Sequence, residues 1–299
     1  MKVRPGNNNG GRRDVVSGGI ESRRRQILRR LGAITGLSFL GGTSALLDGC
    51  GGGGGDDSSG PNPQLGSGPN PQLGAHSSAF RLLGVDTSLL STASMSTRAS
   101  GSTMLACVGR GDKTLFASRA PTDNKGNVYT QLDITRPYTA FPTSGTALYG
   151  VAATAGGPSH IVSAANATNT NQATPDEITL AVVEVINGGV IKDVQWNEVT
   201  LISGNPLTSN SVVTTGPATL VAFWWGDGAF GPHTATPDNG FTVIDSVLLI
   251  GNLVQCAVAT KNVAAAGSYN VTWTARSEVG TPQEGPQGAQ MWLVAVQKA

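Results

Sequence analysis

Residues 178–186 constrain the fold of this chain more than any other stretch. They read Ile-Thr-Leu-Ala-Val-Val-Glu-Val-Ile, nine residues with a single charge at Glu184. A nearly continuous apolar run of this length, rich in β-branched residues, predicts a central strand within a structure of two packed sheets. The rest of the chain must therefore supply further strands that pair with this one.

Other segments with the same character recur at short intervals between turns rich in Gly, Pro, Asn and Asp. They are residues 103–108, 114–118, 127–133, 147–153, 220–225, 241–246, 253–260, 268–275 and 291–296. No stretch combines a 3.6-residue apolar period with helix caps. We therefore expect an all-β domain over residues 76–299, a jelly-roll-like antiparallel β-sandwich. Two smaller sandwiches divided near residues 203–211 are the alternative.

The segment before this domain cannot bury a core. Residues 51–55 are five glycines, and the octad Gly-Pro-Asn-Pro-Gln-Leu-Gly-Ser of residues 60–67 is repeated, with a final Ala, as residues 68–75. Glycine-rich chain is flexible and proline-rich chain is extended, so we interpret residues 50–75 as a linker.

The formal net charge of +1 is the sum of two unlike regions. Residues 1–49 carry +6 and residues 50–299 carry −5. Charged residues make up 13% of the chain, which disfavours nucleic-acid binding.

The order of a basic segment, an apolar run at residues 31–47, small residues and a cysteine is typical of a signal peptide over residues 1–49. A retained membrane anchor is the alternative, but the run is short and contains four glycines.

Two motifs in this leader resemble known export signals. Residues 23–29, with Arg24 and Arg25 before Gln, Ile and Leu, resemble a twin-arginine signal. Residues 47–50, Leu-Asp-Gly-Cys, resemble the lipobox of bacterial lipoproteins, with Asp48 where Ala or Ser is usual. The resemblance implies that Cys50 is acylated and anchors the chain to a membrane. Because Gly51 follows instead of Asp, it implies the outer membrane of the cell envelope. A general secretory leader and cleavage near Ala45 with free secretion are the alternatives.

Within the domain, four short signatures occur in order at residues 123–129, 149–161, 183–188 and 265–269. Together they resemble a loosely defined group of secreted bacterial β-sandwich domains, often found beside carbohydrate-active or adhesive modules. The resemblance spans most of residues 80–297. It implies the fold and an extracytoplasmic setting, and it implies no catalytic residue.

Tryptophans provide the best candidate for ligand binding. Trp224 and Trp225 end a predicted strand and must face opposite sides of it, so one fills the core and the other is free to stack on a sugar. We single out Trp225 as that platform, with Trp196, Asp227 and Glu184 as neighbouring groups. The alternative is that both Trp224 and Trp225 serve packing.

Catalytic patterns are sparse. The chain has no Gly-x-Ser-x-Gly, no His-Glu-x-x-His and no phosphate loop. Paired carboxylates serve glycoside hydrolysis, and the candidates are Glu184, Asp193, Glu198 and Glu278. No spacing selects a second acid, so we favour a binding protein. A glycan hydrolase and a purely structural or adhesive envelope component are the alternatives.

Two further features concern metal and redox chemistry. Residues 123–127 present oxygen atoms at alternate positions around a Gly turn, which fits either a structural calcium near Asp123 or a plain Asx turn. No other cofactor is expected.

Cys107 and Cys256 lie in predicted strands, either paired or as free buried thiols. We favour free thiols, because twin-arginine cargo folds in a reducing cytosol.

Overall fold

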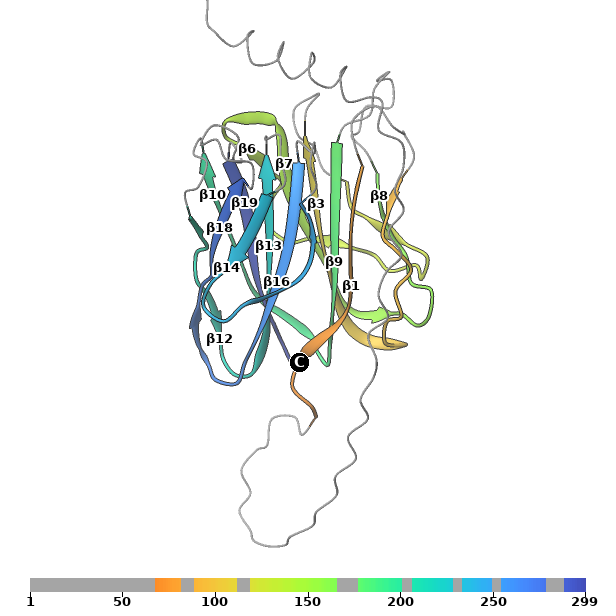
Figure 1. Ribbon diagram of the computed structural model, residues 1–299. Coiled ribbons are helices and arrows are strands. Elements are labelled where there is room, and N and C mark those ends of the chain that lie inside the picture. Colours follow the sequence, from red (N-terminus) through yellow and green to blue (C-terminus); the bar gives the residue numbers. More distant parts are fainter. Residues whose placement is uncertain are drawn as a thin grey trace, which may run out of the picture. The chain divides into compact units, whose positions relative to one another are not determined.

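The computed structural model describes residues 68–81, 89–111, 119–165, 177–200, 206–227, 233–248, 254–277 and 288–299. Every regular element in these ranges is a β-strand, and the strands of all five sheets pair antiparallel (Figure 1). The expected all-β class is confirmed. No helix in this part of the chain is long and apolar enough to cross a membrane.

Two large sheets form the body of the sandwich. The first has the order β1-β9-β3-β7-β5, with β6 paired to β7, and the second has the order β10-β19-β13-β16-β15. The strands of the first sheet are β1 (Gln72–Arg81), β3 (Ser100–Gly111), β5 (Thr130–Gln131), β6 (Arg136–Tyr138), β7 (Phe141–Ala155) and β9 (Glu177–Ile186). Those of the second sheet are β10 (Val190–Thr200), β13 (Ala218–Asp227), β15 (Thr242–Val247), β16 (Val254–Val263) and β19 (Gly288–Gln297). Each sheet is therefore built by one half of the chain.

Three small sheets add outer layers. The first large sheet packs against β2 (Leu90–Ser91), β8 (Val162–Ala164) and β4 (Thr122–Asp123). The second packs against β11 (Leu207–Thr208), β18 (Thr272–Ser277) and β14 (His233–Pro237), and against β12 (Val212–Thr214) with β17 (Gly267–Tyr269). Both large sheets are thus covered on two faces.

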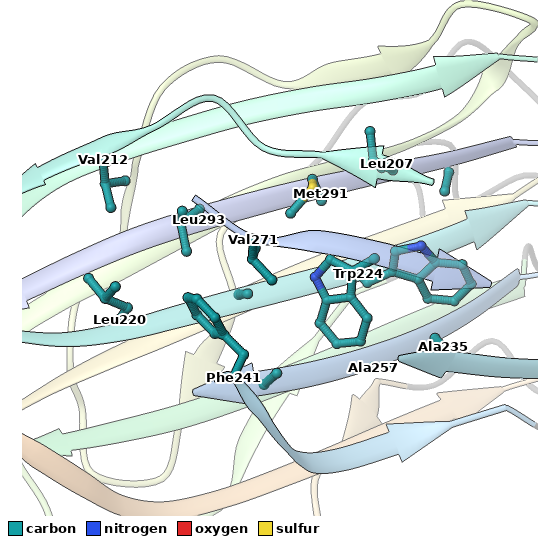
Figure 2. Packing of buried hydrophobic residues seen from close by; sticks show 14 of the residues in the cluster. Leu207, Val212, Leu220, Trp224, Ala235, Phe241, Ala257, Val271, Met291 and Leu293 are labelled. Atoms are coloured by element: carbon teal, nitrogen blue, oxygen red, sulfur yellow. The ribbon is translucent and has the colours of Figure 1, made fainter. Parts of the chain in front are cut away.

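Three apolar layers follow from this arrangement. The central layer joins residues of both large sheets, among them Leu105 and Val183 from the first and Phe223 and Trp292 from the second. An outer layer on the second sheet holds Trp224, and Figure 2 shows it among the buried residues of that layer. Burial on both faces explains why β9 is almost continuously apolar.

The structure extends the sequence prediction in two places. Strand β1 begins at Gln72, so the last residues of the predicted linker belong to the first sheet. Strand β10 was not expected, because its pairing with β19 shifts register between Ile191 and Asp193 and the apolar alternation changes phase there. The predicted strand at residues 114–118 lies outside the described residues.

Candidate functional site

Trp225 is a packing residue in this structure. Its side chain is 2% exposed and meets Tyr138 edge-to-face, with 6.3 Å between the ring centroids. Val254 packs in the same cluster, and Gly109 leaves the space that the indole occupies. Trp224, on the other face of β13, is equally buried and lies 6.5 Å from Trp273. Both tryptophans therefore pack in the interior, which is the alternative given in the sequence analysis. Trp225 presents no free face to a sugar.

Trp196 keeps a partly exposed position. It lies opposite Trp292 in the pairing of β10 with β19, and the two rings are 6.4 Å apart. The guanidinium of Arg136 lies 4.6 Å from the centre of the Trp196 ring, a cation–π contact. Arg136 also pairs with Asp133 in the preceding loop. We call Trp196, Arg136, Asp133 and Glu198 the Trp196 patch.

A buried polar network supports this patch from below. Trp292 Nε1 donates to Thr146 Oγ1 at 2.8 Å, and Thr146 Oγ1 donates to Gln290 Oε1 at 2.8 Å. Gln290 Nε2 donates at 3.1 Å to both the Arg136 carbonyl and Glu198 Oε2. The network joins the two large sheets and fixes the backbone beneath Arg136 and the carboxylate of Glu198.

Glu184 does not join Trp225 or Trp196. Its neighbours in β9, Val183 and Val185, face the central layer, so Glu184 points to the opposite face of the first sheet. The side chain is 2% exposed. Its carboxylate accepts hydrogen bonds from Ala75 N at 3.0 Å, Arg98 N at 2.8 Å and Ser102 Oγ at 2.6 Å. Glu184 therefore ties two backbone segments together, which corrects its assignment as a neighbour of Trp225.

The other predicted residues divide between described and undescribed positions. Asp227 ends β13, where its backbone pairs with Val254 and Gly288, and its side chain lies outside the described atoms. The Asp193 carboxylate has local partners: it accepts hydrogen bonds from Val213 N at 2.8 Å and from Gln195 Nε2 at 2.9 Å. Glu278, Cys50, Arg24 and Arg25 lie outside the described residues.

The turn at Asp123 is an Asx turn built around a buried carboxylate. Oδ1 accepts from the backbone of Lys125 and Asn127, each at 3.0 Å. Oδ2 accepts from Asn127 Nδ2 at 2.7 Å, Tyr129 Oη at 3.2 Å and His160 Nε2 at 3.0 Å. These donors fill the positions that a calcium ion would need. Within the described ranges, no group of three or more His, Cys, Asp and Glu side chains is placed to hold a metal.

Sequence reasoning did not find the partner of Asp123. His160 is 37 residues away and fully buried, and its Nδ1 lies 3.0 Å from Thr97 Oγ1. Asp123, His160 and Thr97 thus follow the acid–base–hydroxyl order of hydrolases. However, the side chains of Asp123 and His160 have no exposed surface, so a substrate has no access to the imidazole. Burial raises the pKa of Asp123, but hydrogen bonds from Asn127, His160 and Lys125 outweigh it and the net pKa is lowered.

The two cysteines are free, as the sequence favoured. Cys107 and Cys256 lie in the central layer, one from each large sheet. Burial raises the pKa of both thiols, that of Cys256 to about 12, so neither is an activated nucleophile.

Many of the described strand ends lie together at one end of the sandwich. The strand ends there flank seven stretches of sequence that lie outside the described residues, namely 82–88, 112–118, 166–176, 201–205, 228–232, 249–253 and 278–287. The pairings place Gly111 beside Glu177 in one sheet, and Asp227 beside Val254 and Gly288 in the other. Gly111 also faces Val254 across the sandwich. We call this the loop end. At the opposite end lie the start of β1, the short turn from β9 to β10 and the C-terminus (Figure 1).

Comparison with known proteins gives no relative for this chain: no protein-family model, no curated protein and no solved structure matches it.

Proposed function

We propose that this chain is an exported, lipid-anchored protein of the cell envelope that binds a glycan or another surface ligand at the loop end of its sandwich. The observation that carries the proposal is the difference between the two ends of the sandwich. The strand ends that flank seven connections lie at one end, and β1 begins at the other. Binding residues on β-sandwiches are carried by loops at one end of a rigid scaffold.

The Trp196 patch is the described surface that best fits a sugar. The Trp196 side chain is partly exposed and its ring lies under the guanidinium of Arg136, while Arg136, Asp133 and Glu198 offer charged groups that orient hydroxyls. The patch lies close to the loop end, because β10 ends at Thr200, which pairs with Gly288. Its polar support is buried, so a bound ligand meets groups that are already positioned.

Binding is tested on a glycan array with the exported chain carrying Cys50→Ser, which keeps it soluble. We expect selective binding that Trp196→Ala and Arg136→Ala each weaken by about tenfold or more, a loss of about 1.4 kcal/mol. Lys192→Ala is the matched control, since Lys192 is exposed on the same strand away from the patch. Absence of any bound glycan, or equal loss in the control, contradicts the proposal.

The anchor is tested separately in cells. Palmitate labelling and partitioning into detergent should disappear in Cys50→Ala, because that thiol would carry the lipid. Replacing Arg24 and Arg25 together by Lys should retain the protein in the cytosol. Unchanged membrane partitioning of Cys50→Ala would argue against lipidation.

A further inference from the structure

The second copy of the octad is bound as a strand at the edge of the first sheet. Gln72 and Leu73 pair with Ile186 and Val185, and Leu73 packs against the central layer. Asn187 Nδ2 donates to the Asn70 carbonyl at 3.3 Å. The last part of β9 and Asn187 therefore form a binding site for a Pro-Asn-Pro-Gln-Leu-Gly segment.

This site selects the octad at two positions. A Cβ atom on Gly74 would lie 2.5 Å from Glu184 Oε2, so a larger residue at this position would have to displace the Glu184 carboxylate from its hydrogen bonds. The next residue contributes its backbone, since Ala75 N donates to Glu184 Oε2. An apolar side chain at Leu73 fills the remaining space against the central layer.

The first copy of the octad meets the same requirements. Residues 60–66 and 68–74 are identical, so Leu65 and Gly66 correspond to Leu73 and Gly74. Ser67 stands where the second copy has Ala75, and only its backbone N–H is needed.

We propose that the first octad is an alternative occupant of this site, so that β1 has two registers eight residues apart. In the alternative register Leu65 replaces Leu73, and residues 68–75 form a loop that returns to His76. The pairing of β1 with β9 already shifts register between Leu73 and His76, and the loop leaves the sheet at that irregularity. Because the first octad belongs to the same chain, its effective concentration at the site is high.

Exchange changes the length of chain before the domain. Residues 51–71 precede β1 in the observed register and residues 51–63 precede it in the alternative one. The difference of eight residues corresponds to about 26 Å of fully extended chain. Closing the extra loop has an entropic cost, so the observed register is the major one.

A cysteine trap tests the exchange in the full chain carrying Cys50→Ser. Gln64→Cys with Ile186→Cys should form a disulfide when Leu73→Asp weakens the second octad, because Gln64 then lies opposite Ile186. Gln72→Cys with Ile186→Cys reports the observed register, and Ser59→Cys with Ile186→Cys measures chance encounters. Peptide mapping without reduction identifies the bond. A yield for Gln64→Cys no higher than that for Ser59→Cys overturns the proposal.

Thermal unfolding provides an independent measurement. Leu65→Asp alone should leave the melting temperature unchanged, and Leu73→Asp should lower it slightly. The double variant should melt about 3 °C or more below Leu73→Asp, because neither octad then fits the site. Equal melting temperatures of Leu73→Asp and the double variant would show that the first octad does not replace the second.

Discussion

At the level of single residues, the polar side chains inside this sandwich act as ties between layers. Glu184 binds two backbone segments across the first sheet, and Gln290 connects both large sheets. Asp123 fixes a turn and a buried histidine. Buried polar groups are tolerated when their hydrogen bonds are satisfied, which these contacts achieve. Glu184 and Asp123, two chemical candidates in the sequence, are therefore structural in the folded domain.

A substitution at Trp225 tests whether this buried side chain serves packing. Trp225→Ala should lower the free energy of unfolding by about 3–5 kcal/mol, since it empties a buried site beside Tyr138. Trp225→Phe should cost less, because it keeps most of the packing. Urea unfolding followed by fluorescence measures both. A fully stable Trp225→Ala variant with lost ligand binding would instead assign Trp225 to recognition.

Asp123 predicts a dependence of stability on pH. Its pKa is lower in the folded protein than its ordinary value of 3.8, so its contribution is complete above about pH 4 and is lost as the pH falls through the folded value. Asp123→Asn should cost about 1–3 kcal/mol at pH 7 and progressively less below pH 4. Unfolding free energies at pH 7 and pH 3 test this, with Asp133→Asn as an exposed control. A difference that stays constant to pH 3 would contradict the assignment.

At the level of elements, the apolar pattern of the sequence predicts the central strands and does not predict the edge strands β1 and β10. Strands β3, β7, β9, β13 and β19 were expected, because burial on both faces gives them long apolar runs. Strand β10 is an edge strand with a register shift, and β1 starts inside a proline-rich repeat. The site was less predictable. His160 and Asp123, or Arg136 and Trp196, meet only through tertiary folding.

The start of β1 can be tested by truncation. Deleting residues 51–67 should change the free energy of unfolding by less than about 0.5 kcal/mol, because the second octad remains in place. Deleting residues 51–75 should lower it by about 2–4 kcal/mol, since it removes Leu73 and leaves a Glu184 oxygen without its donor. Thermal and urea unfolding of both variants measure the difference. Equal stability of the two deletions would place the domain boundary after Ala75.

At the level of the whole molecule, the two halves of the chain depend on one another. Each half builds one large sheet, and the central layer draws its residues from both. The His76–Asp245 pair, at 3.7 Å, links the edge strands β1 and β15. We therefore expect the two halves to unfold together, although each builds its own sheet.

This dependence gives a direct test. Residues 68–189 and residues 190–299, produced separately, should each lack cooperative unfolding, because each exposes its side of the central layer to water. Mixing the two fragments should restore a cooperative transition. Circular dichroism melts and dispersion of amide NMR signals measure the outcome. A sharp melting transition in either fragment alone would show that one sheet is an independent folding unit.

The chain enters and leaves the domain at the same place. A Cβ atom on Gly68 would lie 2.8 Å from Lys298 Nζ, so the first described residues run beside the last ones. A domain with adjacent ends can be inserted into a surface loop of a host protein without stretching it. The same property makes this sandwich a module that evolution or protein engineering can transplant, with its loop end carried outward from the host.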